Sequence, residues 1–298
     1  MIGRSAVAAT LLAVSTLFGQ SNPFVHQGSI GEVKKDQQTT SETVLPTLEV
    51  KDWVGQRFIF LPQPTKLRTY GYQLFEPRLS YSAWVGKIVT VTNVSEGFLP
   101  EVTFRADDGT TVRAKMYSGS INGIAPVRDL EFARSRWLGK TLWIRGNELG
   151  TWNEQTDEFG SVKVRKCSPV EVQDVVAAFF DHEPVRLILK TPDGRVGFYD
   201  LALSGTNVSP ILRKFAHFDD AFFERDPHTT YTWPKNVWDA IENGKVFIGM
   251  SADQATLSWG KPKEVNRTVT ARGAEEQWVY GDSNFLYVNN GKVTAVQN

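Results

Sequence analysis

The sequence predicts a mainly β protein with an α+β C-terminal domain, and three observations support this prediction. A phrase of Trp, branched aliphatic residue, Gly and polar residue precedes three β-rich runs, beginning at Trp53, Trp84 and Trp137. Asp-Gly pairs separate two further pairs of alternating runs, which is a strong hairpin signal. Near the C-terminus, "IGMSADQATLSWGKP" encodes a short helix with clear start and stop signals, followed by more strand-like runs.

Charge and composition limit the classes of function. The chain has 33 basic and 33 acidic residues, whereas a general nucleic-acid binder or a binder of anionic membranes would need a basic excess. Its 298 residues, 41% of them hydrophobic, are enough for two or three small packed domains. We find no P-loop, Rossmann or G-x-S-x-G motif, so we expect no cofactor and no enzymatic activity. A catalytic triad is recognised by geometry, however, and stays open at this stage.

The N-terminus has the pattern of an export signal. Arg4 precedes the apolar run "AVAATLLAVSTLF", which is too short to span a bilayer, and Gly19-Gln20-Ser21 offers a small-x-small cleavage site. We therefore predict a signal peptide over 1–21 and a periplasmic or other extracytoplasmic location; the alternative is a buried N-terminal helix. Without a cysteine just after the run, we expect no lipid anchor, and no later run is long enough to span a membrane. Residues 22–47 are polar, and we interpret them as a flexible linker.

The region 48–205 reads as two or three diverged copies of a small β unit. Asp108-Gly109 and Asp193-Gly194 mark its hairpins, and a Gly after an apolar pair indicates a tight bend into a strand. We predict two β-barrel-like modules, 48–128 and 129–205, of the small SH3-like or OB-like kind. The three Trp residues of the repeat could form an aromatic platform, but burial in the core is the more common role for a Trp that enters a strand.

Two polar features in or near the second module are interpreted as structural. Cys167, the only cysteine, lies in the alternating stretch "VKVRKCSPVEV", where we expect a small residue within a strand and not a reactive thiol. Asp181-His182 followed by Glu183-Pro184 is interpreted as a polar turn before a strand.

Residues 206–233 are predicted to be a long segment that crosses to the C-terminal domain. Phe218, Phe222 and Phe223 interleave with charged residues there, as expected for a segment that covers a core. The same segment contains the potential metal ligands His217, Asp219, Asp220, Asp226 and His228. A metal-dependent envelope hydrolase that uses residues 217–228 is therefore one alternative function, although their spacing matches no established metal motif.

The C-terminal domain, 234–298, is predicted to contain two helices followed by three antiparallel strands. "PKNVWDAIENGK" places apolar residues on one helix face. Ser251 and Gln254 form a capping box for the next helix, and Gly260 and Pro262 end it. Because so short a helix is not stable alone, we expect it to dock on the sheet. The residues that we expect to make this contact are Ala255, Leu257 and Trp259.

The C-terminal domain resembles the SmpA/OmlA, or BamE-like, family of bacterial envelope proteins. The resemblance lies in "IGMS-x-x-Q-x-x-x-x-x-G-x-P", then "EQWVYG", then "YV-x-N-G-K-V". It implies a non-enzymatic interaction scaffold without a cofactor, with outer-membrane protein assembly as the best-known role. The chain differs from the type member because it lacks the lipid-anchor cysteine and carries a large β region in front.

These observations predict an exported envelope protein that binds and does not catalyse. Its partner would be an envelope protein or a cell-wall polymer, with membrane contact possible but no nucleic acid. For the binding residues we select Trp278, Tyr280 and Arg267, near an exposed sheet edge. The alternative for Trp278 and Tyr280 is core packing beneath the two helices. The alternative functions are an inhibitor or immunity-like protein that covers one enzyme, and the hydrolase described above.

Overall fold

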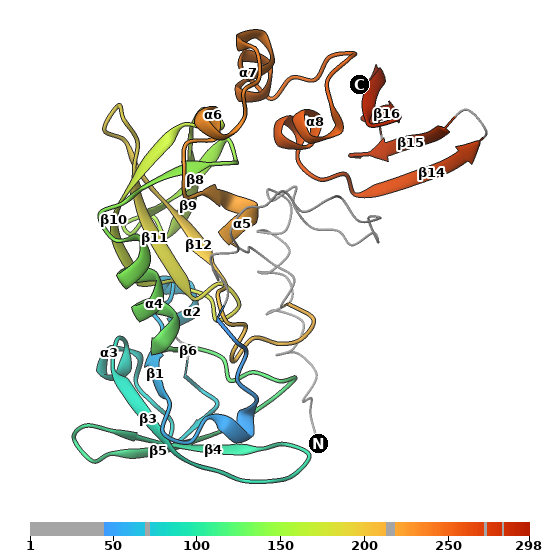
Figure 1. The fold of residues 1–298 in the computed structure, drawn as a ribbon. Helices are drawn as coiled ribbons and strands as arrows, with labels where there is room; N and C mark the ends of the chain where they lie inside the picture. The colour runs from blue at the N-terminus through green and yellow to red at the C-terminus, as the bar shows by residue number, and fades with distance from the viewer. Residues whose placement is uncertain (1–44, 69–71, 213–217, 271–272, 282) are drawn as a thin grey trace. The chain divides into compact units, whose positions relative to one another are not determined.

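A computed structural model describes residues 45–68, 72–212, 218–270, 273–281 and 283–298 (Figure 1). The predicted signal peptide and residues 22–44 of the predicted linker lie outside these ranges. The described residues belong to two compact units, and the boundary between them in the sequence lies between Thr232 and Trp233.

Two sheets form the first unit. The described strands of one sheet lie in the order β2-β5-β4-β3-β1-β6. Their bounds are β1 (Arg57–Phe60), β2 (Phe75–Glu76), β3 (Ile88–Val94), β4 (Glu101–Ala106), β5 (Thr111–Lys115) and β6 (Ile124–Pro126). The short helices η1 (Val50–Asp52), α2 (Thr65–Arg68) and α3 (Tyr81–Trp84) lie between strands of this sheet or just before it in the sequence. Helix α4 (Val127–Trp137) follows β6 and packs against both sheets.

The described strands of the second sheet lie in the order β13-β7-β10-β11-β12-β8-β9. Their bounds are β7 (Thr141–Ile144), β8 (Glu148–Asn153), β9 (Glu158–Lys163), β10 (Pro169–Ala177), β11 (Val185–Lys190), β12 (Val196–Leu201) and β13 (Phe222–Phe223). Helices α5 (Phe218–Ala221) and α6 (Pro227–Thr230) flank β13 in the sequence.

The recurring Trp-Gly phrase forms the same turn three times. Trp53, Trp84 and Trp137 each end a short helix and are at most 8% exposed. In each copy the Trp carbonyl accepts a hydrogen bond from the N–H three residues on, at 2.8–2.9 Å, and the intervening Gly has φ between 73° and 82°. That geometry is a type II turn, which favours Gly at its third position. The predicted bend into a strand and the predicted burial of all three Trp side chains are therefore confirmed.

Each of these turns is also fixed to a neighbouring strand in the same way. The Gly N–H donates to the carbonyl of a strand residue. The N–H of that strand residue donates in return to the backbone carbonyl of the polar residue after the Gly. The strand residues are Val91 for Gly55, Phe60 for Gly86 and Val172 for Gly139. The phrase is thus a repeated local device that turns a helix end into a paired strand.

Both predicted Asp-Gly hairpins are present, but the small barrels are not. Asp108-Gly109 joins β4 to β5, and Asp193-Gly194 joins β11 to β12. The strands that they connect belong to sheets of six and seven described strands, each with two terminal strands, so the prediction of small SH3-like or OB-like modules is wrong. Local turn signals identify a hairpin, but they carry no information on how many more strands join it.

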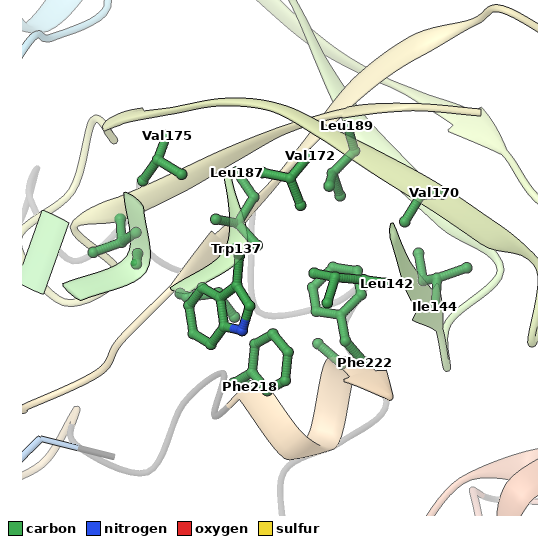
Figure 2. Packing of buried hydrophobic residues seen from close by; sticks show 14 of the residues in the cluster. Trp137, Leu142, Ile144, Val170, Val172, Val175, Leu187, Leu189, Phe218 and Phe222 are labelled. Carbon is green, nitrogen blue, oxygen red and sulfur yellow. The ribbon is translucent and has the colours of Figure 1, made fainter. Parts of the chain in front are cut away.

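The segment after β12 closes the core of the second sheet. Figure 2 shows Phe218 and Phe222 against Trp137 and the strand residues Leu142, Ile144, Val170, Val172, Leu187 and Leu189. The Trp137 and Phe218 rings are stacked with centroids 4.1 Å apart. The indole N–H of Trp137 donates to Glu224 at 2.9 Å, and Arg136 also contacts this carboxylate. The interpretation of Phe218, Phe222 and Phe223 as residues that cover a core is confirmed.

Cys167 is buried, but it does not lie in a strand as predicted. It occupies a turn between β9 and β10 with φ of 58°, and its N–H donates to the Ile144 carbonyl at 2.7 Å. The alternating pattern around it extends over the ends of two strands, and the turn interrupts that pattern.

The second unit begins at Trp233 and contains helices α7 (Lys235–Glu242) and α8 (Ala252–Trp259). Its described strands form one antiparallel sheet in sequence order. Their bounds are β14 (Glu264–Thr270), β15 (Gly273–Val279), β16 (Phe285–Asn289) and β17 (Lys292–Gln297). The described residues thus contain four strands here, where three were expected.

Helix α8 is punctuated and docked as predicted. The Ser251 side chain accepts from the Gln254 N–H, and the Gln254 side chain accepts from the Ser251 N–H. The helix packs against α7 and β17, with Ala255 and Leu257 buried and Trp259 half-buried.

Candidate binding surface

Strand β14 is a terminal strand of the C-terminal sheet and is exposed along its length. Its described side chains, from Glu264 to Val269, are all exposed, with Val265 38% and Val269 73% accessible. It pairs with β15 through seven consecutive residue pairs, from Glu264 opposite Val279 to Thr270 opposite Gly273. An edge strand of this kind presents backbone donors and acceptors on its outer side.

One carboxylate links two of the three predicted binding residues. Glu276 lies opposite Arg267 in the register, and the guanidinium Nε is 3.5 Å from Glu276 Oε1. The other oxygen, Oε2, accepts the indole N–H of Trp278 at 2.9 Å. Trp278 is 7% exposed, whereas the Arg267 side chain is 53% exposed. Arg267 is therefore the accessible member of this group, and Trp278 is its buried support.

Tyr280, the third predicted residue, belongs to a different contact. Its hydroxyl donates to the Gly260 carbonyl at 3.0 Å, just after α8. Its ring meets Trp259 edge to face with centroids 5.3 Å apart, and Trp259 donates its indole N–H to the Gly244 carbonyl at 3.0 Å. Burial raises the pKa of Tyr280 well above its ordinary value, so the hydroxyl remains a donor. In this arrangement Tyr280 holds the end of α8 on the sheet.

The opposite face of the sheet carries a row of hydrogen-bonded polar side chains. Asn266 donates to Gln277 at 3.3 Å, and the Gln277 amide donates to the Tyr287 hydroxyl at 3.2 Å. The hydroxyl donates in turn to Gln297 at 3.2 Å. The row crosses all four described strands and ends at β14, where Asn266 is exposed. Sequence reasoning did not find it, because the row depends on the register of all four strands together.

The proposed metal ligands do not converge in the described residues. Asp226 is the N-cap of α6, and its side chain accepts a hydrogen bond from the backbone N–H of His228 at 2.9 Å. The ring Nδ1 of His228 also lies 2.7 Å from Oδ1 of Asp226. Asp219 and Asp220 lie in α5, and His217 lies outside the described residues. Within the part of the chain that the structure describes, no three His, Cys, Asp or Glu side chains are grouped so that they could hold a metal ion.

A second group of charges lies beside the seven-stranded sheet and was not predicted. Arg186 on β11 donates Nε and Nη2 to the two oxygens of Asp200 on β12, each at 2.7 Å. The guanidinium also lies over two rings, 4.2 Å from the centroid of Phe179 and 3.7 Å from that of Phe198. A signal was available in the sequence, since counting outward from the Asp193-Gly194 turn pairs Arg186 with Asp200.

The turn before β11 adds titratable groups to this region. It contains Asp181, His182 and Glu183, as the predicted polar turn requires. Burial raises the pKa of Glu183 to about 7. Burial lowers the pKa of His182, but a hydrogen bond with Asp181 and the nearby negative charges outweigh it and raise the pKa overall.

The aromatic rings near these groups pack against one another. Trp152 and Phe159 have centroids 4.5 Å apart, and Phe179 lies 5.1 Å and 5.8 Å from them. Rings at these separations are in mutual contact. The arrangement is a small aromatic cluster on the sheet, with the Arg186–Asp200 pair beside it.

Comparison with known proteins assigns no family, because no family model, no curated protein and no solved structure matches the chain. The resemblance to the SmpA/OmlA family is therefore wrong: no family match supports it, and the chain is mostly β, with its strands in several large sheets. A capping box, a Gly stop and a following Pro are features that many short docked helices share, which explains why the motif misled. None of the described helices is long and apolar enough to cross a membrane.

Proposed function

We propose that this chain is an exported envelope protein that binds a partner protein through the β14 side of its C-terminal unit, without catalysing a reaction. The signal peptide predicted over 1–21 supports the location. The observation that carries the proposal is the exposed edge strand β14, with the accessible Arg267 held by the Glu276–Trp278 support.

A protein partner suits this surface better than a cell-wall polymer does. Exposed valines at 265 and 269 flank Arg267 on the face that carries Trp278, so the strand offers two apolar contacts around one charge. A polysaccharide is usually bound through exposed aromatic faces, whereas the aromatic residues of this unit that were selected as binding residues are buried or half-buried.

Photocrosslinking in intact cells tests the proposal. A photoreactive amino acid replaces Val269, which is 73% exposed on β14, or Val196, which is 52% exposed on the other unit and serves as the matched control. We expect one discrete protein adduct from position 269 and not from position 196. An adduct with a single enzyme that loses activity in the complex would identify the inhibitor alternative. An adduct that disappears on digestion of the cell wall, or no adduct at all, would contradict the proposal.

A further inference from the structure

We infer that β14 binds an extended strand of the partner protein, and that this strand carries an acidic side chain opposite Arg267 with an apolar side chain two residues to each side of it. The inference rests on the proposed function and names the kind of partner segment that the same surface accepts. Strand addition at a sheet edge uses backbone hydrogen bonds for affinity and alternate side chains for specificity.

Among the described strands, β14 is the terminal strand least protected against such pairing. The terminal strands β2 and β13 have two residues each and β6 has three. On β9, the Lys163 carbonyl is occupied by Arg195, which donates Nη1 to it at 2.7 Å. On β17, residues 249–252 pair with the start of the strand, where Gly249 donates to the Val293 carbonyl and Val293 donates back to Met250, each at 2.8 Å. Native edges are normally blunted by such devices.

Strand β14 has seven residues and a continuous register. Its sequence, "EVNRTVT", contains no Pro, Gly or Lys, the residues that commonly interrupt or protect an edge. Threonine and valine make up four of its seven residues, and both favour extended structure. The strand is therefore already in the conformation that a pairing partner needs.

The side chains of β14 define what the incoming strand must carry. Val265, Arg267 and Val269 lie on the face that contains Trp278 and Glu276, because residues opposite each other in a sheet share a face. The incoming strand places alternate side chains opposite these three. Arg267 contacts Glu276 through Nε, and a guanidinium has five N–H donors, so donors remain for a second carboxylate. Charge complementarity thus selects an apolar–x–acidic–x–apolar pattern.

The same charge argues against a second copy of β14 in the registers that match a valine of one copy with a valine of the other. A two-fold antiparallel pairing that matches Val265 of each copy with Val269 of the other places the two Arg267 side chains opposite each other. Like charges directly opposite destabilise a strand pair. If the two-fold axis passes through Val265 instead, Lys263 of each copy lies opposite Arg267 of the other, which is again a pair of like charges.

Peptide binding to the full mature chain tests the inference. The probe is a fluorescently labelled Thr-Val-Thr-Glu-Thr-Val-Thr peptide, whose pattern is the same in both directions, and the comparison peptide has Lys in place of Glu. We expect anisotropy to show binding of the Glu peptide, at least about fivefold weaker binding to Arg267→Glu, and a matching gain for the Lys peptide with that variant. The double variant V265K/V269K should lose both peptides, whereas the control Val196→Lys should behave as the unaltered chain does.

The outcomes separate this inference from the proposed function. A protein adduct from position 269 without peptide binding, or with peptide binding that Arg267→Glu leaves unchanged, overturns the strand inference and leaves the function standing. Absence of both adduct and peptide binding overturns both. Concentration-dependent dimers in analytical ultracentrifugation that V265K/V269K abolishes would overturn the inference in favour of a second copy. Hydrogen exchange of β14–β17 in each variant shows that the sheet remains folded.

Discussion

Arg186 and Asp200 face each other across β11 and β12 and share two hydrogen bonds, from Nε to Oδ1 and from Nη2 to Oδ2. Their side chains are only 7% and 14% exposed. Removing one partner of a buried pair leaves the other charge uncompensated, which typically costs about 3–5 kcal/mol. We expect Arg186→Met to destabilise the second sheet by about that amount, measured as faster amide hydrogen exchange in β10–β12.

The double variant R186M/D200L is the control for this prediction. It removes both charges and keeps apolar side chains in their place, so we expect it to recover most of the lost stability. If Arg186→Met alone exchanges as slowly as the unaltered chain, the ion pair contributes little to the stability of this region.

Glu183 should make the stability of the first unit depend on pH. Burial raises its pKa from an ordinary value of 4.5 to about 7, so the folded state holds a proton that the unfolded chain has already lost. The stabilising effect is complete below pH 4.5 and is lost as the pH rises through about 7. Glu183→Gln removes this loss, and we expect the variant to be more stable than the parent above pH 7 by about 3 kcal/mol.

Urea unfolding below pH 4.5 and above pH 7 measures this effect. Glu158→Gln, an exposed residue on β9, is the matched control and should give the same pH dependence as the parent. His182 contributes a slope of the same sign, because its pKa is also raised in the folded state, so the dependence should weaken but not vanish in Glu183→Gln. An unchanged pH dependence in Glu183→Gln would contradict the prediction.

Asn207 is buried and connects the segment after β12 to the start of β6 and the residues before it. Its Oδ1 accepts the Ile121 N–H at 2.7 Å, and its Nδ2 donates to the carbonyls of Ile121 and Ile124 at 2.9 and 2.8 Å. Its φ of 62° is a conformation that Asn tolerates better than most residues. We expect Asn207→Ala to destabilise the unit by about 3 kcal/mol, because buried backbone groups lose their partners.

Asn93→Ala is the matched control for Asn207→Ala in urea unfolding, since Asn93 is exposed on β3. Asn93 and Asn207 both begin an Asn-x-Ser/Thr sequence, so the local sequence does not distinguish them. The role of Asn207 as a buried connector would be contradicted if Asn93→Ala changed the free energy of unfolding by more than about 1 kcal/mol, or if Asn207→Ala changed it by less than that.

The Trp-Gly turns and the α8 cap could be predicted because their physics is local. A type II turn needs a residue with positive φ at its third position, and a Gly there is visible in the sequence. The Ser251–Gln254 box likewise depends on two residues three apart. Sheet size could not be predicted in this way, because β13, with only Phe222 and Phe223, joins β7 across a long stretch of chain.

The predicted binding residues also combine a feature that the local sequence determines with contacts that depend on strand pairing. Placing Arg267 on an exposed strand required only alternation, whereas the links from Glu276 to Arg267 and to Trp278 require the register of β14 on β15. The Arg186–Asp200 pair could have been predicted from the sequence, because the Asp193-Gly194 turn fixes the register of β11 on β12.

Asp226 should act as a helix cap and not as a metal ligand. Its side chain accepts the His228 N–H at the start of α6. Loss of such a cap typically costs about 1 kcal/mol. We expect Asp226→Ala to reduce stability by about that amount, and Asp226→Ser, which retains an acceptor, to restore most of it. Elemental analysis of the purified chain should give the same metal content for all three proteins. Stoichiometric metal that Asp226→Ala removes would revive the metal-site alternative.

Substitutions of Trp278 and Arg267 should have different effects, although both residues contact Glu276. We expect the first to reduce the stability of the sheet and the second to reduce binding of the partner. Trp278 is buried, and replacing a large buried aromatic residue by Ala typically costs about 3–5 kcal/mol. Arg267 is half-exposed, and a surface pair such as Arg267–Glu276 contributes about 0–1 kcal/mol. We therefore expect Trp278→Ala to open the C-terminal sheet and Arg267→Ala to leave it folded.

Amide hydrogen exchange over β14–β17 measures whether each variant keeps the sheet folded. The yield of the crosslinked adduct from position 269 measures whether it still binds the partner. With Arg267→Ala, exchange should match that of the parent while the adduct yield falls, because the contact is lost from a folded surface. Trp278→Phe keeps an aromatic ring in the core and should preserve most of the stability, while it removes the indole N–H that holds Glu276. An Arg267→Ala chain that unfolds, or one that crosslinks as well as the parent does, would show that Arg267 does not act as the accessible contact on this surface.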